Sequence, residues 1–227
     1  MKGLYLTIDD APRKDFKKKI DFLISKKIEA VIFCTGELAE RNKEALQYAI
    51  KMGFTLGNHG YNHPHFSSLT AGQAKEQIEK TDKIIDSVYD SIKENRLLKL
   101  FRFPYGDNGG MLAKSFQEIL ADLNYKQMDY KNVNPIYEKV FGKELDMMWT
   151  IDPQDWKMNP IGEEGGENQS FEKTIKNLKE NGGLYLKDSN FTDIFLIHDH
   201  NGTSEKFPQV IEFLLQNEVI FLPPVHT

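Results

Sequence analysis

Two adjacent carboxylates, Asp9 and Asp10, follow an apolar run near the start of the chain, and two histidines, His59 and His63, stand four positions apart further on. Two imidazoles and one carboxylate, with a position left open for water, form a common ligand set for a catalytic zinc ion. Asp10 could supply that carboxylate. Simpler interpretations exist, because the acids could form a turn before Pro12 and the histidines could be polar loop residues.

A strand that ends at the two neighbouring acids would give their side chains different surroundings. Residues 3–6 are apolar and typical of a buried strand that ends near the acids. Successive side chains of a strand point to opposite faces, so Asp9 and Asp10 are expected to do different work. The spacing of His59 and His63 would align both rings on a helix, but glycines and a proline interrupt this stretch. We therefore expect a tight turn that directs both rings at one point.

Strand-like and helix-like patterns alternate along the chain. This alternation predicts an α/β protein with a parallel sheet covered by helices. Residues 126–145 have a mixed pattern, with one short helix expected near residues 136–140. The expected strands are residues 3–6, 30–34, 54–56, 98–101, 147–151, 194–197 and 219–222, and the other expected helices are residues 15–27, 42–52, 70–94, 111–123, 170–180 and 204–216.

Polar side chains stand at the ends of several of these strands. The carboxyl ends of parallel strands meet at one face of an α/β protein, and such proteins carry their chemistry there. The positions are therefore expected to converge on a single site. The side chains concerned are Asp9, Asp10, His59, Arg102, Asp152 and His198.

Each of these residues also has an ordinary structural interpretation. Arginines such as Arg102 commonly form surface ion pairs. Asp152 and Asp155 flank a proline and could form turns. His198 follows four apolar residues, so a hydrogen-bonded histidine at the edge of the core is the default for it. For three further histidines, His65, His200 and His226, we expect no role in the site.

Composition narrows the class of protein. The 227 residues suit one domain, residues 1–227, and the apolar (40%) and charged (28%) fractions are ordinary for a soluble protein. The net charge of −5 argues against nucleic-acid binding. The single cysteine, Cys34, excludes an internal disulfide. No run approaches membrane-spanning length, and no protein partner is indicated. Without a visible signal peptide we expect a cytoplasmic protein, or an extracytoplasmic one if the chain is trimmed from a longer one.

The order of the motifs resembles a known family. The patterns D-D-x-P after a strand, H-x-x-x-H-P, R-x-P-Y-G, D-x-x-D-W and L-x-H follow one another between Leu4 and His198. This order is similar to that of the polysaccharide deacetylases with NodB homology, which form carbohydrate esterase family 4. The resemblance implies an irregular (β/α) barrel, commonly of seven strands. It also implies metal-dependent removal of N-acetyl groups from the amino sugars of chitin, peptidoglycan or a related polysaccharide.

The resemblance also implies a role for each residue of these motifs. Asp10, His59 and His63 would hold a divalent metal, Zn²⁺ in the first place or else Co²⁺ or Ni²⁺. Asp9 would be the general base, and Arg102 would keep it ionised.

The remaining implied roles concern the leaving group and the substrate. His198 would protonate the departing amine, and Asp155 would orient its imidazole. The backbone N–H of Tyr105 would face the oxyanion. The residues that would contact the carbohydrate substrate are Trp156, Leu196, Pro104 and Tyr105, with Trp156 and Leu196 forming the walls around the acetyl methyl group.

Three positions depart from the family pattern. Ala11 stands where glycine is usual, Gly60 replaces a serine or threonine after the first histidine, and Phe103 stands where proline is common. Gly60 is the one that could remove a hydrogen bond fixing the site. None of the three removes a ligand or a proton carrier. The segment 126–145 is longer than the family leads us to expect and could shape the substrate groove.

Two other functions stay open. A related deacylase could act on a small, non-polymeric amide, which the missing signal peptide favours. The chain could also be a catalytically silent carbohydrate-binding domain. Such a domain would be expected to lack the base, a metal ligand or the acid, and all of these are present.

Overall fold

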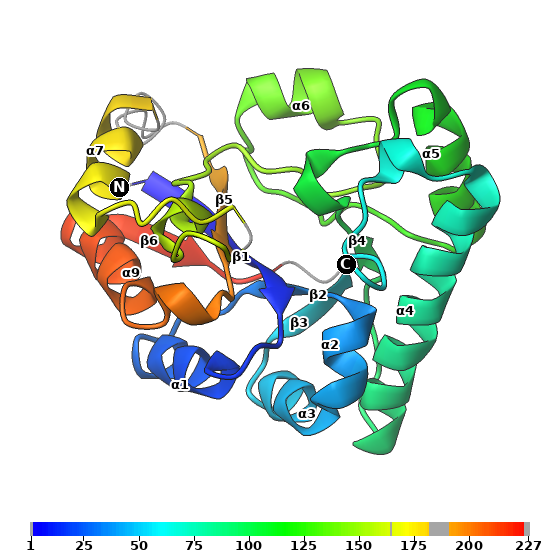
Figure 1. Ribbon diagram of the computed structural model, residues 1–227, viewed down its shortest axis with the longest axis horizontal. Coiled ribbons are helices and arrows are strands. Elements are labelled where there is room, and N and C mark those ends of the chain that lie inside the picture. The colour runs from blue at the N-terminus through cyan, green and yellow to red at the C-terminus, as the bar shows by residue number, and fades with distance from the viewer. Residues whose placement is uncertain (1, 164, 182–190, 225–227) are drawn as a thin grey trace.

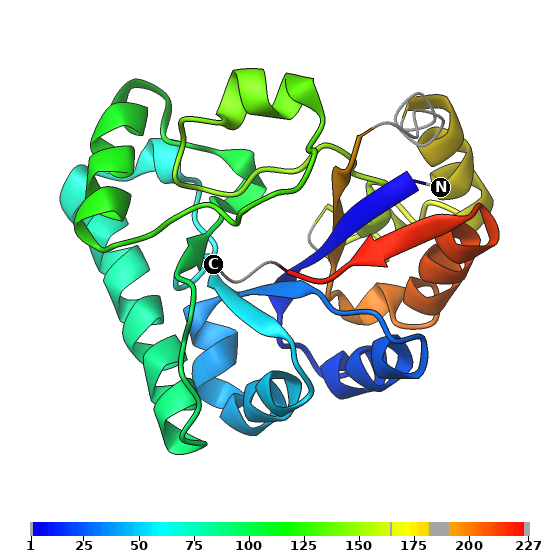
Figure 2. The same cartoon turned by 180° about the vertical axis from the view of Figure 1, so that it is seen from behind.

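A parallel β-sheet forms the centre of the computed structural model, which describes residues 2–163, 165–181 and 191–224. Helices lie around the sheet in both views (Figures 1 and 2). Within the described residues the strand order is β4-β3-β2-β1-β5, and β6 pairs with β1. The strands are β1 (Lys2–Ala11), β2 (Val31–Cys34), β3 (Thr55–Asn58), β4 (Leu100–Phe101), β5 (Asp193–His198) and β6 (Val219–Leu222).

The helices occupy the positions that the apolar patterns predict, with one addition. The chain enters α2 directly after β2, where we expected only the end of a strand. The long helix α4 begins with a capping box between Thr70 and Gln73, at the start of the helix predicted over residues 70–94. The helices are α1 (Phe16–Ser25), α2 (Gly36–Arg41), α3 (Lys43–Lys51), α4 (Ala71–Ser91), α5 (Ala113–Asp122), α6 (Pro135–Phe141), α7 (Phe171–Asn181) and α9 (Phe207–Gln216). None of these described helices combines the length and apolar composition that a membrane crossing requires.

Strand β1 separates two apolar regions of the protein. Leu4, Leu6 and Ile8 pack in the large core that the outer helices share. Tyr5 points to the other side, into a second cluster with residues of β2, β4 and β5. Alternation along the strand therefore directs Asp9 to the same side as Tyr5. The apolar residues of β1 thus fix the direction in which the first acid points.

The predicted strand at residues 147–151 is the main difference from the expected architecture. It forms only an isolated bridge, between Ile151 and Phe195 of β5. The segment still links the two outer strands, because the Met147 N–H donates to the Phe101 carbonyl (2.8 Å) and the Thr150 N–H donates to the Ile194 carbonyl (2.9 Å). The α/β class and the barrel-like arrangement are confirmed, with irregular backbone where a seventh strand was expected.

The segment 126–145 contains the short helix α6, as predicted. Its Met128 and Tyr137 are buried in the same cluster as Tyr5 and Val31. The Gln127 side chain donates to two carbonyls near the end of α6, at 2.7 and 2.6 Å. Figure 1 shows α6 on the side of the sheet away from α1 and α3. The segment thus packs against the inner face of the strands, and the residues described in it do not line the pocket described below.

Candidate active site

The side chains of Asp10, His59 and His63 lie close together, as the sequence predicts. One ligand atom from each of the three lies within 4.8 Å of the others. The Asp10 Oδ1 atom is 3.1 Å from His63 Nε2 and 3.6 Å from His59 Nε2. This oxygen is buried, and no donor among the described residues is aligned to hydrogen-bond with it. Two imidazole nitrogens and a buried carboxylate oxygen facing one another fit a divalent metal ion such as zinc.

Each metal-facing histidine is held by its own surroundings. His59 Nδ1 lies 2.8 Å from the Arg102 carbonyl oxygen, which directs Nε2 toward Asp10. Burial is the main cause that lowers the pKa of His59, which favours the neutral ring that can act as a ligand. The turn between the two histidines is fixed from α4, because Gln77 Oε1 accepts from the backbone N–H of Tyr61 (2.8 Å). Asn58 Oδ1 accepts from the Gly60 N–H (2.9 Å).

Three residues of this site have a strained backbone conformation. Asp10, His63 and Tyr105 adopt positive φ values of 63°, 59° and 60°. This region is uncommon for residues other than glycine, and strained residues cluster where a site must be held in one geometry. The turn at Asp10 explains how its carboxylate leaves the line of the strand and reaches the histidines.

Asp9 has a separate position and a separate partner. Its carboxylate is buried, and Arg102 Nη1 donates to Oδ1 at 2.7 Å. The Arg102 side chain is fully buried, and it also donates to Thr7 Oγ1 (2.8 Å) and to the Met147 carbonyl (2.7 Å). Asp9 Oδ2 lies 3.6 Å from His59 Nε2. Both acids thus lie near His59, but Asp9 pairs with Arg102, whereas Asp10 approaches His63.

His198 lies beside Asp9, because β5 pairs in register with β1 at these two residues. Asp155 is fully buried and binds His198 twice, at the backbone N–H (3.0 Å) and at ring Nδ1 (2.8 Å). Burial lowers the pKa of His198, but Asp155, with smaller contributions from Asp10 and Asp9, outweighs burial and raises it to about 10. Asp155 thus orients the ring and favours its protonated form.

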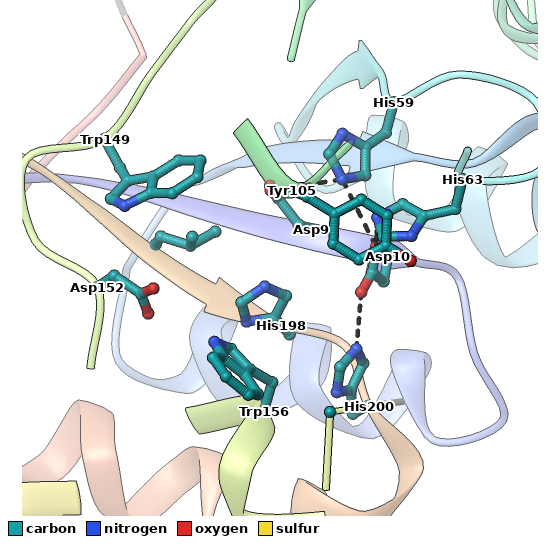
Figure 3. Close-up of a pocket in the computed structure, with 12 residues that line it drawn as sticks. Asp9, Asp10, His59, His63, Tyr105, Trp149, Asp152, Trp156, His198 and His200 are labelled. Carbon is teal, nitrogen blue, oxygen red and sulfur yellow. Dashed lines mark hydrogen bonds and ion pairs between the residues drawn. The ribbon is translucent and has the colours of Figure 1, made fainter. Parts of the chain in front are cut away.

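A cavity of about 240 Å³ joins these groups. Leu196 and Trp156 line it, as the family resemblance implies, and so do Trp149 and Asp152. Figure 3 shows the triad on one side, His198 near the middle and the two tryptophans at the other side. Burial is the main cause that raises the pKa of Asp152. Pro104, which the resemblance placed at the substrate, is buried and does not line the cavity.

His200 was the residue missed by the sequence analysis. We expected no role for it, yet its Nε2 atom lies 2.7 Å from Asp10 Oδ2 and it lines the cavity. The expectation was wrong because His200 follows the end of β5, where strand periodicity no longer tells which way a side chain points. The sequence signal that could have placed His200 at the site is its position two residues after His198. His65 lies outside the triad and stacks on Tyr105 with ring centroids 4.0 Å apart, and His226 lies outside the described residues.

The structure accommodates the three residues that depart from the family pattern, Ala11, Gly60 and Phe103. Ala11 does not adopt a positive φ, so its methyl group causes no backbone strain. Gly60 does adopt one (72°), and the hydrogen bond to Asn58 holds its backbone. Phe103 packs edge-on against Phe66 with centroids 5.0 Å apart.

The amino-terminal part of the chain shows the family to which the chain belongs. A sequence profile of the family described as Polysaccharide deacetylase matches residues 1–128, more than half of the 227 residues. The chain belongs to the polysaccharide deacetylase family. The resemblance inferred from the five motifs is therefore confirmed.

Relatives and solved structures agree with this assignment. The peptidoglycan-N-acetylglucosamine deacetylase of Bacillus cereus is 27% identical over 191 residues, which are 80% of this chain and 65% of that protein. This chain thus spans slightly less than two thirds of that relative.

Two solved structures share the fold over 97% of this chain. The family 4 carbohydrate esterase of Streptomyces lividans, in complex with acetate, has a TM-score of 0.67 at 20% identity over 91% of its own chain. A pseudoenzyme of carbohydrate esterase family 4 from Bacillus anthracis has a TM-score of 0.67 at 18% identity over 64% of its chain. At such identities they establish the fold alone, and the pseudoenzyme means that activity must be argued from the site.

Metal binding by this deacetylase-family chain is directly testable. We expect one zinc ion per chain, bound by Asp10, His59 and His63 with Zn–N distances of about 2.0–2.1 Å. His63→Ala should lower the bound zinc well below one equivalent, whereas the exposed His65→Ala should leave it unchanged. Dialysis followed by elemental analysis measures both variants. A zinc-loaded crystal structure with the three side chains pointing apart would contradict the assignment.

Proposed function

We propose that this chain is a metal-dependent hydrolase that removes N-acetyl groups from the N-acetylated amino sugars of a glycan. The observation that carries the proposal is the convergence of Asp9 and His198 on the triad of Asp10, His59 and His63 in one cavity. Family membership supports the reaction type. The B. cereus relative acts on peptidoglycan N-acetylglucosamine, which supports an amino sugar as the substrate.

The proposed chemistry begins with the attacking water. A divalent cation at the triad, with zinc our first choice and cobalt or nickel the alternatives, would activate this water and polarise the acetyl carbonyl. Asp9 takes the proton of the water as its oxygen bonds to the acetyl carbon. The ion pair with Arg102 keeps Asp9 ionised and fixes its orientation. The neighbouring acids therefore divide the work, one holding the metal and the other moving the proton.

The second half of the reaction depends on His198. The carbon–nitrogen bond breaks as the imidazolium of His198 gives its proton to the amine, because an amine anion is a very poor leaving group. Asp155 orients the ring for this transfer. The backbone N–H of Tyr105 donates to the oxyanion. Leu196 and Trp156 enclose the acetyl methyl group.

Acetate release tests this proposal. The zinc-loaded protein should release acetate from chitin oligomers or peptidoglycan fragments. Release from N-acetylated small amines alone would favour a deacylase of small amides. If the protein binds one zinc and an oligosaccharide but releases no acetate from any substrate, a silent carbohydrate-binding domain is the better description. The small-amide outcome contradicts the proposed substrate class, and the silent-domain outcome contradicts the proposed activity.

The pH dependence of turnover tests the proton donor. Asp155 is the largest contribution that raises the pKa of His198, to about 10. A cation beside Asp10 would offset the smaller contributions of Asp10 and Asp9, so the basic limb of the metal-loaded enzyme should lie at or below roughly pH 10. Asp155→Asn should move that limb to lower pH, because the imidazolium loses its carboxylate.

A pH–rate series on the metal-saturated wild type, Asp155→Asn and His198→Ala makes this measurement. The exposed Asp129→Asn serves as the control and should reproduce the wild-type profile. An unmoved basic limb in Asp155→Asn, or full activity in His198→Ala, would exclude His198 as the donor.

A further inference from the structure

His200 contacts the one oxygen of Asp10 that faces away from the other two histidines. Its Nε2 atom is 2.7 Å from Asp10 Oδ2, whereas His63 and His59 approach Oδ1. Figure 3 shows His200 below Asp10 and the two other histidines above it. Among the described residues, the group able to hold a metal contains Asp10, His59 and His63 but not His200. His200 therefore hydrogen-bonds to the Asp10 carboxylate and is not one of the residues that could hold the metal.

The ring of His200 is fixed at both nitrogens. Its Nδ1 atom forms a short contact with the side-chain amide nitrogen of Asn159. An amide nitrogen can only donate, so Nδ1 accepts and the ring hydrogen stands on Nε2. Nε2–H then points at Asp10 Oδ2 as a donor.

The backbone of His200 is fixed as well. Its carbonyl oxygen accepts from Lys19 Nζ (2.9 Å) and from Thr203 Oγ1 (3.0 Å). Lys19 also forms a buried ion pair with the neighbouring Asp199, at 2.6 Å. The second oxygen of that carboxylate accepts from the Arg13 N–H (2.6 Å), in the loop that follows Asp10. The loops after β1 and β5 are thus joined, and His200 is only 3% exposed.

We propose that His200 is a positioning residue that engages Oδ2 of Asp10 and so leaves Oδ1 alone to face the metal position. A carboxylate free to rotate could offer both oxygens and occupy two coordination positions. A carboxylate with one oxygen already hydrogen-bonded is pre-oriented, so less ordering is needed when the metal binds. This inference rests on the divalent-metal part of the proposed function and not on the identity of the glycan.

Substitutions that separate hydrogen bonding from packing test the inference. Glutamine can carry an N–H donor about as far as Nε2 of histidine, whereas asparagine is too short and leucine has no donor. We expect His200→Leu and His200→Asn to bind zinc about 10–100-fold more weakly than the wild type, the range found when such outer hydrogen bonds are removed. His200→Gln should stay within about threefold of the wild type.

Zinc affinity, measured by competition with a chelating indicator, is the readout, so the test does not depend on acetate release. His65→Leu is the matched control, because His65 lies near the site without contacting Asp10, and its affinity should equal that of the wild type. The two polar variants keep the test valid if leucine at position 200 prevents folding. The inference is overturned if His200→Asn binds zinc as tightly as the wild type, or if His200→Gln is as weak as His200→Asn.

Discussion

Asp9→Asn is expected to lower the rate of acetate release by about 10²–10⁴-fold, the usual contribution of a general base. Asparagine is nearly isosteric with aspartate, but it cannot take the proton of the attacking water. Zinc stoichiometry should stay at one ion per chain, because Asp9 is not among the residues of the triad. Steady-state rates on a chitin oligomer and zinc analysis of the same samples make the measurement.

The exposed Asp129→Asn is the control for this variant, since it makes the same chemical change outside the cavity. Its rate should equal that of the wild type. If Asp9→Asn keeps a near wild-type rate, Asp9 is a structural residue of the strand end and the base must be sought elsewhere.

Arg102→Met is expected to cause the largest loss of stability. The substitution leaves Asp9 buried without its cation and removes donors to Thr7 and to the Met147 carbonyl. Removing one partner of a buried ion pair typically costs about 3–5 kcal/mol. Urea unfolding of the metal-free protein measures the change in the free energy of unfolding.

A double variant identifies the cause of that loss. Arg102→Met combined with Asp9→Asn should be less destabilised than Arg102→Met alone, because no unpaired charge then remains buried. The surface pair of Arg41 and Glu37 gives the contrast, since Arg41→Met should cost at most about 1 kcal/mol. A cost for Arg102→Met no larger than that for Arg41→Met would show that the buried pair does not hold the site together.

The sequence predicted most of the fold because its signals are local. The apolar runs specify the strands, and the 3.6-residue stripes specify the helices. Parallel strands also gather their carboxyl ends at one face, so Asp9, His59 and Arg102 could be placed together without coordinates. The different directions of Asp9 and Asp10 followed from strand alternation, although the positive φ of Asp10 was not foreseen.

Other features depend on contacts that no local pattern encodes. Residues 147–151 have a strand-like composition, yet their backbone hydrogen bonds go to two different strands and form one bridge. The segment 126–145 could have covered the cavity, but Met128 and Tyr137 bury it against the inner face of the sheet. His200 reaches Asp10 because distant Lys19 and Asn159 fix the loop that carries it. Such contacts arise only once the strands have been assembled.

Titration of the metal-free protein with zinc, while acetate release from a chitin oligomer is followed, tests the central claim most directly. The account predicts a rate that rises in proportion to added zinc and reaches a plateau at one ion per chain, with no rise in His63→Ala. A rate that does not depend on zinc, or an equal rise in His63→Ala, would contradict it.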